Sequence, residues 1–391
     1  MSQDLSQFES SDGSSSMAHS PTHKKWYQRV DWPVTLFLLI TPLVALILVP
    51  IYYVVEPVHW PLLLFALAFA AATNLSITAG YHRLFAHKSY EAHPLIRALY
   101  LLVGASAWQG SALKWCADHR RHHGKVDTEH DPYSINKGFW YAHMGWLFLR
   151  ESTDHNPKAP DLEKDWMIRI QHKYYIPIAI FMGFGVPAWI GYFMGCPFGG
   201  LVIAGALRIS LTQQSTFFVN SLCHTLGRKT YSEDISARDS LFVAFLTHGE
   251  GYHNFHHHFQ SDYRNGIRWY QWDPTKWTIR ILAFLGLAKK LRRISQQEIL
   301  KARLQMEALK IQSKGYSEEV THQLREKIIS AQMQMKKLKT DYEHLKSEMS
   351  SASREKLEAL KLEIEIRKIE FQFAMKQWET YLKGPQLAYS R

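Results

Sequence analysis

Apolar residues gather in four long blocks along the chain, and polar residues separate the blocks. Residues 32–55, 58–81 and 174–196 contain no Asp, Glu, Lys or Arg. The fourth block, residues 199–220, is interrupted by one arginine and several polar side chains. Since a helix rises roughly 1.5 Å per residue, each block is long enough to cross a bilayer. The pattern therefore predicts an all-α, multi-pass membrane protein with four transmembrane helices.

The links between these blocks predict the topology. Only residues 56–57 and 197–198 separate the members of each pair, so the spans form two tight hairpins. The N-terminus, the segment 82–173 and everything after residue 220 then lie on one side of the membrane. Two lysines and an arginine within residues 24–29 precede the first span. By the positive-inside rule, this shared side is the cytosol.

The two ends of the chain differ from this membrane domain, which we place at residues 24–290. Residues 1–23 are polar and rich in serine, and we expect a disordered tail there. Within residues 291–391 an apolar seam steps by four and three residues, as in a heptad repeat. The seam predicts a helical hairpin, a three-helix appendage, or a coiled coil through which the chain would form an oligomer. Its residues are Leu324, Ile328, Ala331, Met335, Leu338, Tyr342, Leu345 and Met349.

Composition excludes several classes of protein. With 46% hydrophobic and 21% charged residues among 391, the chain is not disordered throughout. Its 3 cysteines are widely spaced, which argues against a disulfide scaffold and a cysteine-rich zinc site. The net charge of +11 suits an anionic membrane surface, an anionic substrate or nucleic acid. Because the basic residues flank membrane spans and form no groove-binding motif, we expect no nucleic-acid partner.

The chain has 21 histidines, and nine of them form four clusters. Two clusters have the pattern H-x2-H-H, whose positions i, i+3 and i+4 share one helix face, so each cluster is expected to point three imidazoles at one spot. Asn220 and His224 are likewise spaced i, i+4. His82 and His87 are five residues apart, roughly 140° out of alignment on a straight helix, so the helix is expected to end or bend near Leu84–Ala86. The nine are His82, His87, His119, His122, His123, His224, His253, His256 and His257.

Nine imidazoles are too many for one ion, whereas two metals with four or five nitrogens each fit the count. Imidazole suits iron, zinc, copper and nickel. The clusters are dominated by histidine, whereas bundle di-iron proteins use a carboxylate-rich ligand set with paired Glu-x-x-His helices. An all-nitrogen pair of irons in a cytosolic helical cap beside a membrane suggests oxygen activation for attack on a lipid carbon. We expect six of the other histidines to be structural or to lie near the metals without binding them: His59, His93, His143, His172, His248 and His258.

Four motifs in this order resemble the membrane-bound acyl-CoA delta-9 desaturases. They are HRLFAH (82–87), HRRHH (119–123), NSLCH (220–224) and GEGYHNFHHHF (249–259). The resemblance covers roughly residues 26–290, and the last motif separates this family from related hydroxylases and alkane oxygenases. The segment DYRNG (262–266) is similar to bacterial members in particular. We therefore expect a bacterial inner-membrane protein, or an endoplasmic-reticulum protein if the chain is eukaryotic.

The resemblance also implies a set of site residues. It assigns the nine histidines to two iron ions and gives Asn220 a water near one of them. An acyl tunnel would bend beside the metals, lined by Gln109, Trp115 and Thr216. Phe217 is a fourth expected tunnel residue, and it stands where a tryptophan is common in animal members. Arg83, Arg120, Arg121 and Lys125 lie near the histidine motifs, where they would either attract an anionic substrate or belong to the ordinary positive-inside charge.

The implied reaction is the O2-dependent insertion of a cis double bond, at delta-9, into a saturated fatty acyl chain. The acyl carrier is expected to be CoA, with a carrier protein or a glycerolipid as alternatives. Two electrons must come from a separate ferredoxin, rubredoxin-like or haem protein, because the sequence has no flavin, haem or cysteine-ligated cluster motif. The alternatives are a fatty-acyl or alkane hydroxylase on the same scaffold, and a membrane scaffold whose tail recruits partners.

Overall fold

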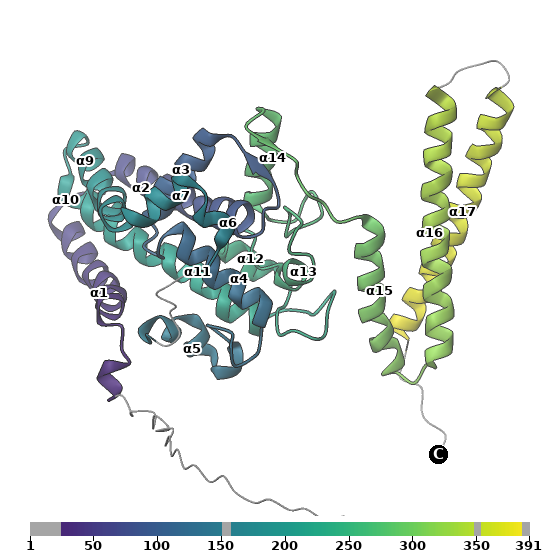
Figure 1. Cartoon of the computed structure of the whole chain (residues 1–391), viewed down its shortest axis with the longest axis horizontal. Coiled ribbons are helices and arrows are strands. Elements are labelled where there is room, and N and C mark those ends of the chain that lie inside the picture. Colours follow the sequence, from purple (N-terminus) through teal and green to yellow (C-terminus); the bar gives the residue numbers. More distant parts are fainter. Residues whose placement is uncertain (1–24, 151–157, 348–352, 385–391) are drawn as a thin grey trace, which may run out of the picture.

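The computed structural model describes residues 25–150, 158–347 and 353–384, so the predicted tail at residues 1–23 lies outside the described residues. These residues are mostly helical, as the sequence predicted (Figure 1). One small antiparallel sheet pairs β1 (Glu91–Ala92) with β2 (Ala288–Lys289). The three cysteines are free thiols, as expected.

Three helices are long and apolar enough to cross a membrane. The first is α1 (Trp32–Val55), which begins after Asp31, whose side chain accepts a hydrogen bond from the N–H of Val34. Large apolar side chains such as Leu46 are mostly exposed on α1, an arrangement that suits contact with lipid. The second, Trp60–Ala86, joins α2 (Trp60–Leu75) to the π-helical η2 (Ser76–Ala86), and the third, Tyr175–Phe193, joins α8 (Tyr175–Ile180), η5 (Phe181–Gly185) and α9 (Val186–Phe193).

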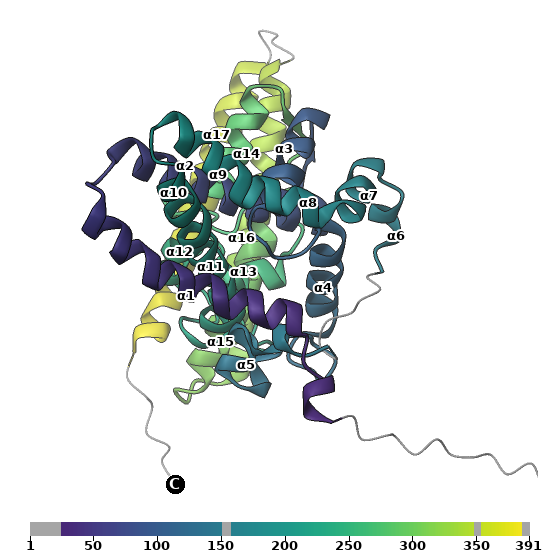
Figure 2. The ribbon, with the colours of Figure 1, turned by 90° about the vertical axis from the view of Figure 1, so that its left-hand side faces the viewer.

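The fourth predicted span is a continuous helical run that is less apolar than the other three. It consists of α10 (Pro197–Gly199), η6 (Gly200–Leu207) and α11 (Arg208–Thr225). The run contacts α1 and α2, and Figure 2 shows α1 crossing in front of α11. Arg208 is 2% exposed, and its guanidinium donates to the carbonyl oxygens of Ala204, Ser106 and Gly183. This helix packs inside the bundle, where its polar side chains have protein partners. It can therefore carry polar residues, and its mean hydropathy is lower than that of the other three.

Shorter helices lie between and after these long ones, and two of them, α4 and α13, carry the two H-x2-H-H motifs. Before α8 they are η1 (Trp26–Gln28), α3 (Pro94–Ala105), α4 (Ala112–Lys125), η3 (Ile135–Lys137), α5 (Phe139–His143), η4 (Gly145–Phe148), α6 (Pro160–Glu163) and α7 (Trp166–Lys173). After α11 they are α12 (Leu241–Leu246), α13 (His253–His258) and α14 (Pro274–Phe284). The N-terminus of α4 is capped by the hydroxyl of Ser111, which accepts from the N–H of Lys114. This cap starts the helix that carries the HRRHH motif.

Three helices follow the histidine region and share a separate hydrophobic core. They are α15 (Gln296–Gln312), α16 (Glu318–Ser347) and α17 (Ser353–Lys383), and the last two form the long hairpin at one side of Figure 1. The heptad seam on α16 contributes Leu324 and Ile328 to this core, together with Trp378 of α17. The seam thus packs within the chain over its first turns, and its last residue, Met349, lies outside the described residues.

Candidate metal centre

The nine clustered histidines lie together in two groups, although they come from four separate elements. In each group the nearest ring nitrogens lie within 4.8 Å of one another. The Nε2 atoms of His82 and His256 are 2.9 Å apart, although 174 residues separate them along the chain. The five-histidine group is His82, His87, His119, His123 and His256; the four-histidine group is His122, His224, His253 and His257.

His82 and His87 meet because the helix changes its winding. Residues Ser76–Ala86 are π-helical, and the N–H of His87 donates to the carbonyl oxygen of His82 at 3.0 Å. A π-turn joins residues i and i+5, so two side chains five positions apart come onto the same side. Their ring centroids lie 4.8 Å apart. The helix ends at Ala86, as expected, but the π-helical winding brings the rings together.

The two H-x2-H-H motifs each divide between the groups, which corrects the prediction that each motif points three imidazoles at one spot. On α4, His119 and His123 join the five-histidine group, while His122 joins the other. On α13, His253 and His257 share the four-histidine group, and His256 crosses to the first. Residues i and i+4 are only roughly 40° apart around a helix, whereas i+3 and i+4 differ by roughly 100°. The middle histidine of each motif, His122 on α4 and His256 on α13, therefore points to the other group.

The histidine nitrogens fit a metal better than they fit one another. A neutral imidazole has a single N–H, so a cluster of facing ring nitrogens leaves lone pairs directed at lone pairs. Burial lowers the pKa of His119, His123, His256 and His257 well below the usual value, which keeps these rings neutral as metal ligands must be. Close Nε2 pairs are His87–His119 at 2.8 Å, His123–His256 at 3.0 Å, His253–His257 at 3.1 Å and His122–His257 at 3.3 Å.

In three histidines, the Nδ1 atom, on the far side of the ring from Nε2, lies within hydrogen-bond distance of an oxygen. Nδ1 of His82 lies 3.0 Å from Oε2 of Glu250, and Nδ1 of His122 lies 2.9 Å from Oδ1 of Asp131. Nδ1 of His224 lies 2.6 Å from the hydroxyl of Ser236. Such partners keep the proton on Nδ1 and leave the Nε2 lone pair for a metal. The sequence does not predict these three oxygens; only Glu250 lies within a recognised motif, GEGYHN.

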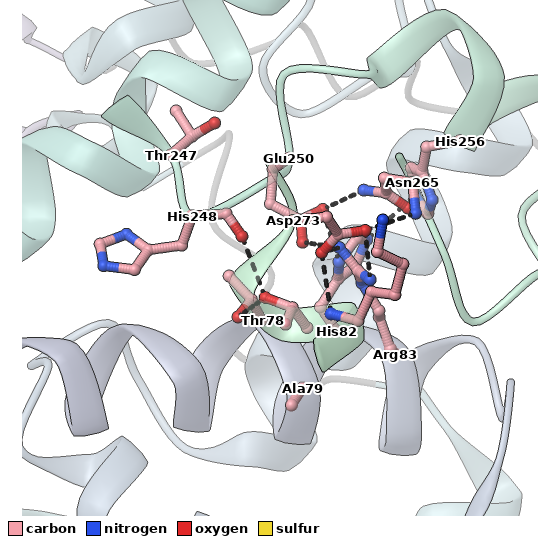
Figure 3. Close-up of polar contacts among 12 residues, drawn as sticks. Thr78, Ala79, His82, Arg83, Thr247, His248, Glu250, His256, Asn265 and Asp273 are labelled. Carbon is pink, nitrogen blue, oxygen red and sulfur yellow. Dashed lines mark hydrogen bonds and ion pairs between the residues drawn. The ribbon is translucent and has the colours of Figure 1, made fainter. Parts of the chain in front are cut away.

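A buried ionic network lies behind His82 (Figure 3). The guanidinium of Arg83 is 2.8 Å from Oε1 of Glu250 and donates to Oδ2 of Asp273 at 3.1 Å. Asn265 donates to the other oxygen of Glu250 at 2.7 Å. Burial by itself would raise the pKa of Glu250, but the charge of Arg83 and the hydrogen bonds from His82 and Arg83 lower it to about 2. Glu250 is thus an ionised carboxylate with three donors, His82, Arg83 and Asn265.

This network corrects one expectation for the basic residues near the motifs. Arg83 is 1% exposed and paired with two carboxylates, so it does not attract a substrate from solution. Arg120 donates to both carboxylate oxygens of Asp161 and to the carbonyl oxygens of Phe85 and Ala86. Both arginines therefore stabilise the fold through ion pairs and hydrogen bonds.

A cavity of about 550 Å³ opens beside the two groups. It extends from His119 and His253 to Phe37 of α1 and Tyr175 of α8. A chain of three predicted tunnel residues borders it: the indole N–H of Trp115 donates to Oε1 of Gln109 at 3.2 Å, and Nε2 of Gln109 donates to the hydroxyl of Thr216 at 2.9 Å. The ring of Trp115 also stacks on His119, with centroids 5.0 Å apart. Phe217 and Asn220 line the same cavity.

The six other histidines considered in the sequence lie outside both groups. His59 and His93 accept from backbone N–H groups at the starts of α2 and α3. His143 contacts Ser221 and Gln214, and His172 contacts Ser111. Thr275 donates to the carbonyl oxygen of His248, and His258, next to His257 in the chain, is exposed and joins neither group.

Comparison with known proteins agrees with this geometry. Residues 58–283 match the model of a family described as fatty acid desaturase. Acyl-CoA desaturase 1 of Saccharomyces cerevisiae is 40% identical over 299 residues, which cover 75% of this chain and 58% of that protein. A probable acyl-CoA desaturase of Schizosaccharomyces pombe is 38% identical over 288 residues, covering 73% of this chain and 59% of its own length. Stearoyl-CoA desaturase 5 of Bos taurus is 35% identical over 234 residues, covering 58% of this chain and 70% of its own length.

The match to the two yeast proteins thus spans less than two thirds of their length. These relatives are eukaryotic, whereas the DYRNG segment had indicated bacterial members.

Proposed function

The chain belongs to the fatty acid desaturase family, and from that premise we propose that it is an O2-dependent di-iron acyl-CoA desaturase. It inserts a cis double bond at delta-9 into a saturated acyl chain. The observation that carries this proposal is the pair of histidine groups at one wall of a mostly apolar cavity. The names of the relatives, acyl-CoA desaturase and stearoyl-CoA desaturase, support CoA as the acyl carrier.

Each histidine group would hold one iron ion, and Asn220, which lines the cavity beside them, would contribute through a water. Iron with O2 supplies the oxidising power that no side chain has for removing hydrogen from two unactivated methylenes. The chain's own contribution is to fix the imidazoles. Glu250, Asp131 and Ser236 set the rings of His82, His122 and His224, so that their Nε2 atoms face inward.

The cavity would orient the acyl chain and exclude water from it. Trp115, stacked on His119, brings an apolar surface next to the histidines. Its hydrogen bond to Gln109, and the bond from Gln109 to Thr216, hold that wall in one conformation. Phe217 is 4% exposed and completes the lining. Such placement is what selects one carbon–carbon bond of an otherwise uniform chain.

We further propose four membrane spans, the fourth being residues 199–220 within the helical run 197–225. Two hairpins then place all nine histidines on one side, which the basic residues before α1 assign to the cytosol. The eukaryotic relatives favour the endoplasmic reticulum over a bacterial inner membrane. Residues 24–290 would form the catalytic membrane domain and residues 291–391 an appendage available for oligomer formation. Electrons would arrive from a ferredoxin, a rubredoxin-like protein or a haem protein.

The test is the fatty-acid profile of cells that lack their own desaturase and express this chain. The double variant His119→Ala/His122→Ala removes one histidine from each group, and His258→Ala is the matched control because His258 belongs to neither. We expect a new cis monounsaturated acid from the wild type and from His258→Ala, and none from the double variant. A hydroxy acid would instead indicate a hydroxylase. A double bond elsewhere would overturn the delta-9 assignment alone.

A further inference from the structure

The segment that joins α11 to α12 is folded around one buried amide next to the metal centre. We call residues 226–240 the strap. Oδ1 of Asn254 accepts from the N–H groups of Thr230, Tyr231 and Ser232 at 2.9, 2.6 and 3.2 Å. Its Nδ2 donates to the carbonyl oxygens of Ser232 and Ala237 at 2.9 and 3.0 Å. Asn254 is fully buried and follows His253 directly, so the strap is fastened to the helix that carries three of the nine histidines.

Held in this way, the strap presents Ser236 to His224. The hydroxyl of Ser236 donates to Oδ1 of Asp127 at 2.6 Å, and the N–H of Ser236 donates to Oδ2 of the same carboxylate at 2.7 Å. A hydroxyl has one hydrogen, which here points at Asp127, so toward His224 it acts as the acceptor. Nδ1 of His224, 2.6 Å away, therefore carries the proton. The Nε2 atom of His224 is buried and has no hydrogen-bond partner among the described residues.

Asp127 is itself held in an unusual conformation. Its φ is +62°, a value that residues other than glycine rarely adopt. Oδ2 of Asp131 accepts from its N–H at 3.1 Å, and Asn136 donates to its carbonyl oxygen at 2.7 Å. The other oxygen of Asp131 faces Nδ1 of His122. Strained backbone of this kind persists where several contacts enforce it, and such sites often serve function.

We propose that Asp127 and Ser236 are positioning residues that tune the four-histidine group as a metal site. They link the segment after α4, the end of α11 and the strap, and Ser236 contacts His224, a member of the four-histidine group. In the five-histidine group, the corresponding role falls to Glu250 on His82 and to the hydroxyl of Tyr133, 3.4 Å from Nδ1 of His119. Loss of the Asp127–Ser236 pair should therefore weaken one metal site and spare the other. This inference rests on the proposed pair of metals but not on the acyl substrate.

The experiment measures metal binding by the purified full chain. Stripped protein is titrated with Fe²⁺ under anaerobic conditions and, separately, with Co²⁺, whose visible absorption reports its coordination. The variants are Ser236→Ala, Asp127→Asn and the conservative Ser236→Thr, which keeps the hydroxyl. Ser232→Ala is the matched control: it lies in the same strap, and its hydroxyl accepts only from the N–H of Asp234.

We expect Ser236→Ala to bind one of two metals about 10- to 100-fold more weakly, with the other unchanged. Ser236→Thr and Ser232→Ala should bind both as the wild type does, and Asp127→Asn should weaken the same single site. Two sites of wild-type affinity in Ser236→Ala would overturn the inference, as would equal loss at both sites or the same loss in Ser232→Ala. A wild-type chain that binds no metal would refute the proposed centre itself.

Discussion

Nδ1 of His82 and Oε2 of Glu250 lie 3.0 Å apart, and both side chains are buried. This contact joins the end of the second long apolar helix to the loop that precedes the last histidine motif. It fixes the ring of His82, and through Oε1 of the same carboxylate it also neutralises the buried guanidinium of Arg83. One side chain thus supports both a candidate metal ligand and the surrounding fold.

Glu250→Gln should therefore impair the metal centre. The amide keeps the shape of the carboxylate but places an NH2 group against one of its three donors, and it removes the negative charge beside Arg83. We expect metal affinity or desaturation to fall about 10- to 100-fold. The measurement is iron per purified chain together with product yield in cells. Glu91→Gln, which alters an exposed carboxylate paired with Lys290, should leave both values unchanged; equal behaviour of the two variants would contradict the assigned role.

Gly80→Ala should destabilise the π-helical segment. A Cβ at Gly80 would lie 2.7 Å from Cβ of Tyr100, which is too close for either residue to keep its place. Overpacking of this kind costs about 1–3 kcal/mol. Gly124→Ala is the control, because nothing lies within 4 Å of a Cβ there and alanine favours a helix by up to about 1 kcal/mol. Thermal unfolding in detergent should rank Gly124→Ala at or above the wild type and Gly80→Ala below it; the reverse order would count against the packing described here.

Thr216→Val should disturb the cavity wall without changing its volume. Valine cannot accept from Nε2 of Gln109, which leaves that amide unpaired at a cost of about 1–3 kcal/mol. If the cost appears in the transition state, kcat/KM falls roughly 5- to 150-fold, and the double-bond position becomes less uniform. Thr225→Val on the same helix is the control, since the hydroxyl of Thr225 bonds only to backbone carbonyls one turn earlier. Unchanged kinetics and product in Thr216→Val would show that this hydrogen bond does not shape the site.

Asp239 makes stability depend on pH. Burial raises its pKa to about 6, although the N–H of Phe255 donates to its Oδ1. Since the folded value lies above the unfolded value of about 3.9, the folded state binds more protons, and this group's contribution to stability declines as pH rises toward 6. Asp239→Asn keeps an acceptor for Phe255 and carries no charge. We expect the variant to be more stable than the wild type at pH 7.5, by on the order of 1–3 kcal/mol, with a smaller difference at pH 5. Unfolding at both pH values tests this, and a variant less stable at pH 7.5 would disprove it.

Trp378→Ala should unfold the C-terminal helices and spare the histidine groups. Trp378 is 1% exposed, packs in the core of α15, α16 and α17, and donates its indole N–H to Glu307 at 2.7 Å. Truncating it should cost about 3–5 kcal/mol. Phe373→Ala is the control, because Phe373 of the same helix is 58% exposed. Limited proteolysis should cleave the C-terminal helices faster in Trp378→Ala alone, while the fatty-acid profile stays that of the wild type. A loss of product would mean that these helices support the metal centre.

The apolar helices could be predicted from the sequence because their signal is local. The uninterrupted apolar run at residues 32–55 coincides with α1, and lipid-facing helices need little beyond such a run. The nine clustered histidines were identified from motif spacing and order, and the heptad steps located a helix that packs along its seam. In each case the predictive pattern, either the period of an α-helix or an apolar run as long as a bilayer is thick, lies within a short stretch of sequence.

Only the tertiary structure decided how the histidines divide and what orients them. The split of each H-x2-H-H motif depends on where two other elements approach, and the pairing of His82 with His87 depends on π-helical winding. Glu250 reaches Arg83 across 167 residues, and Asp127 reaches Ser236 across 109. No sequence pattern around a single carboxylate or hydroxyl identifies its partner. Its role is fixed when the packing of distant helices brings it within 3 Å of one imidazole nitrogen, and that packing is a property of the whole chain.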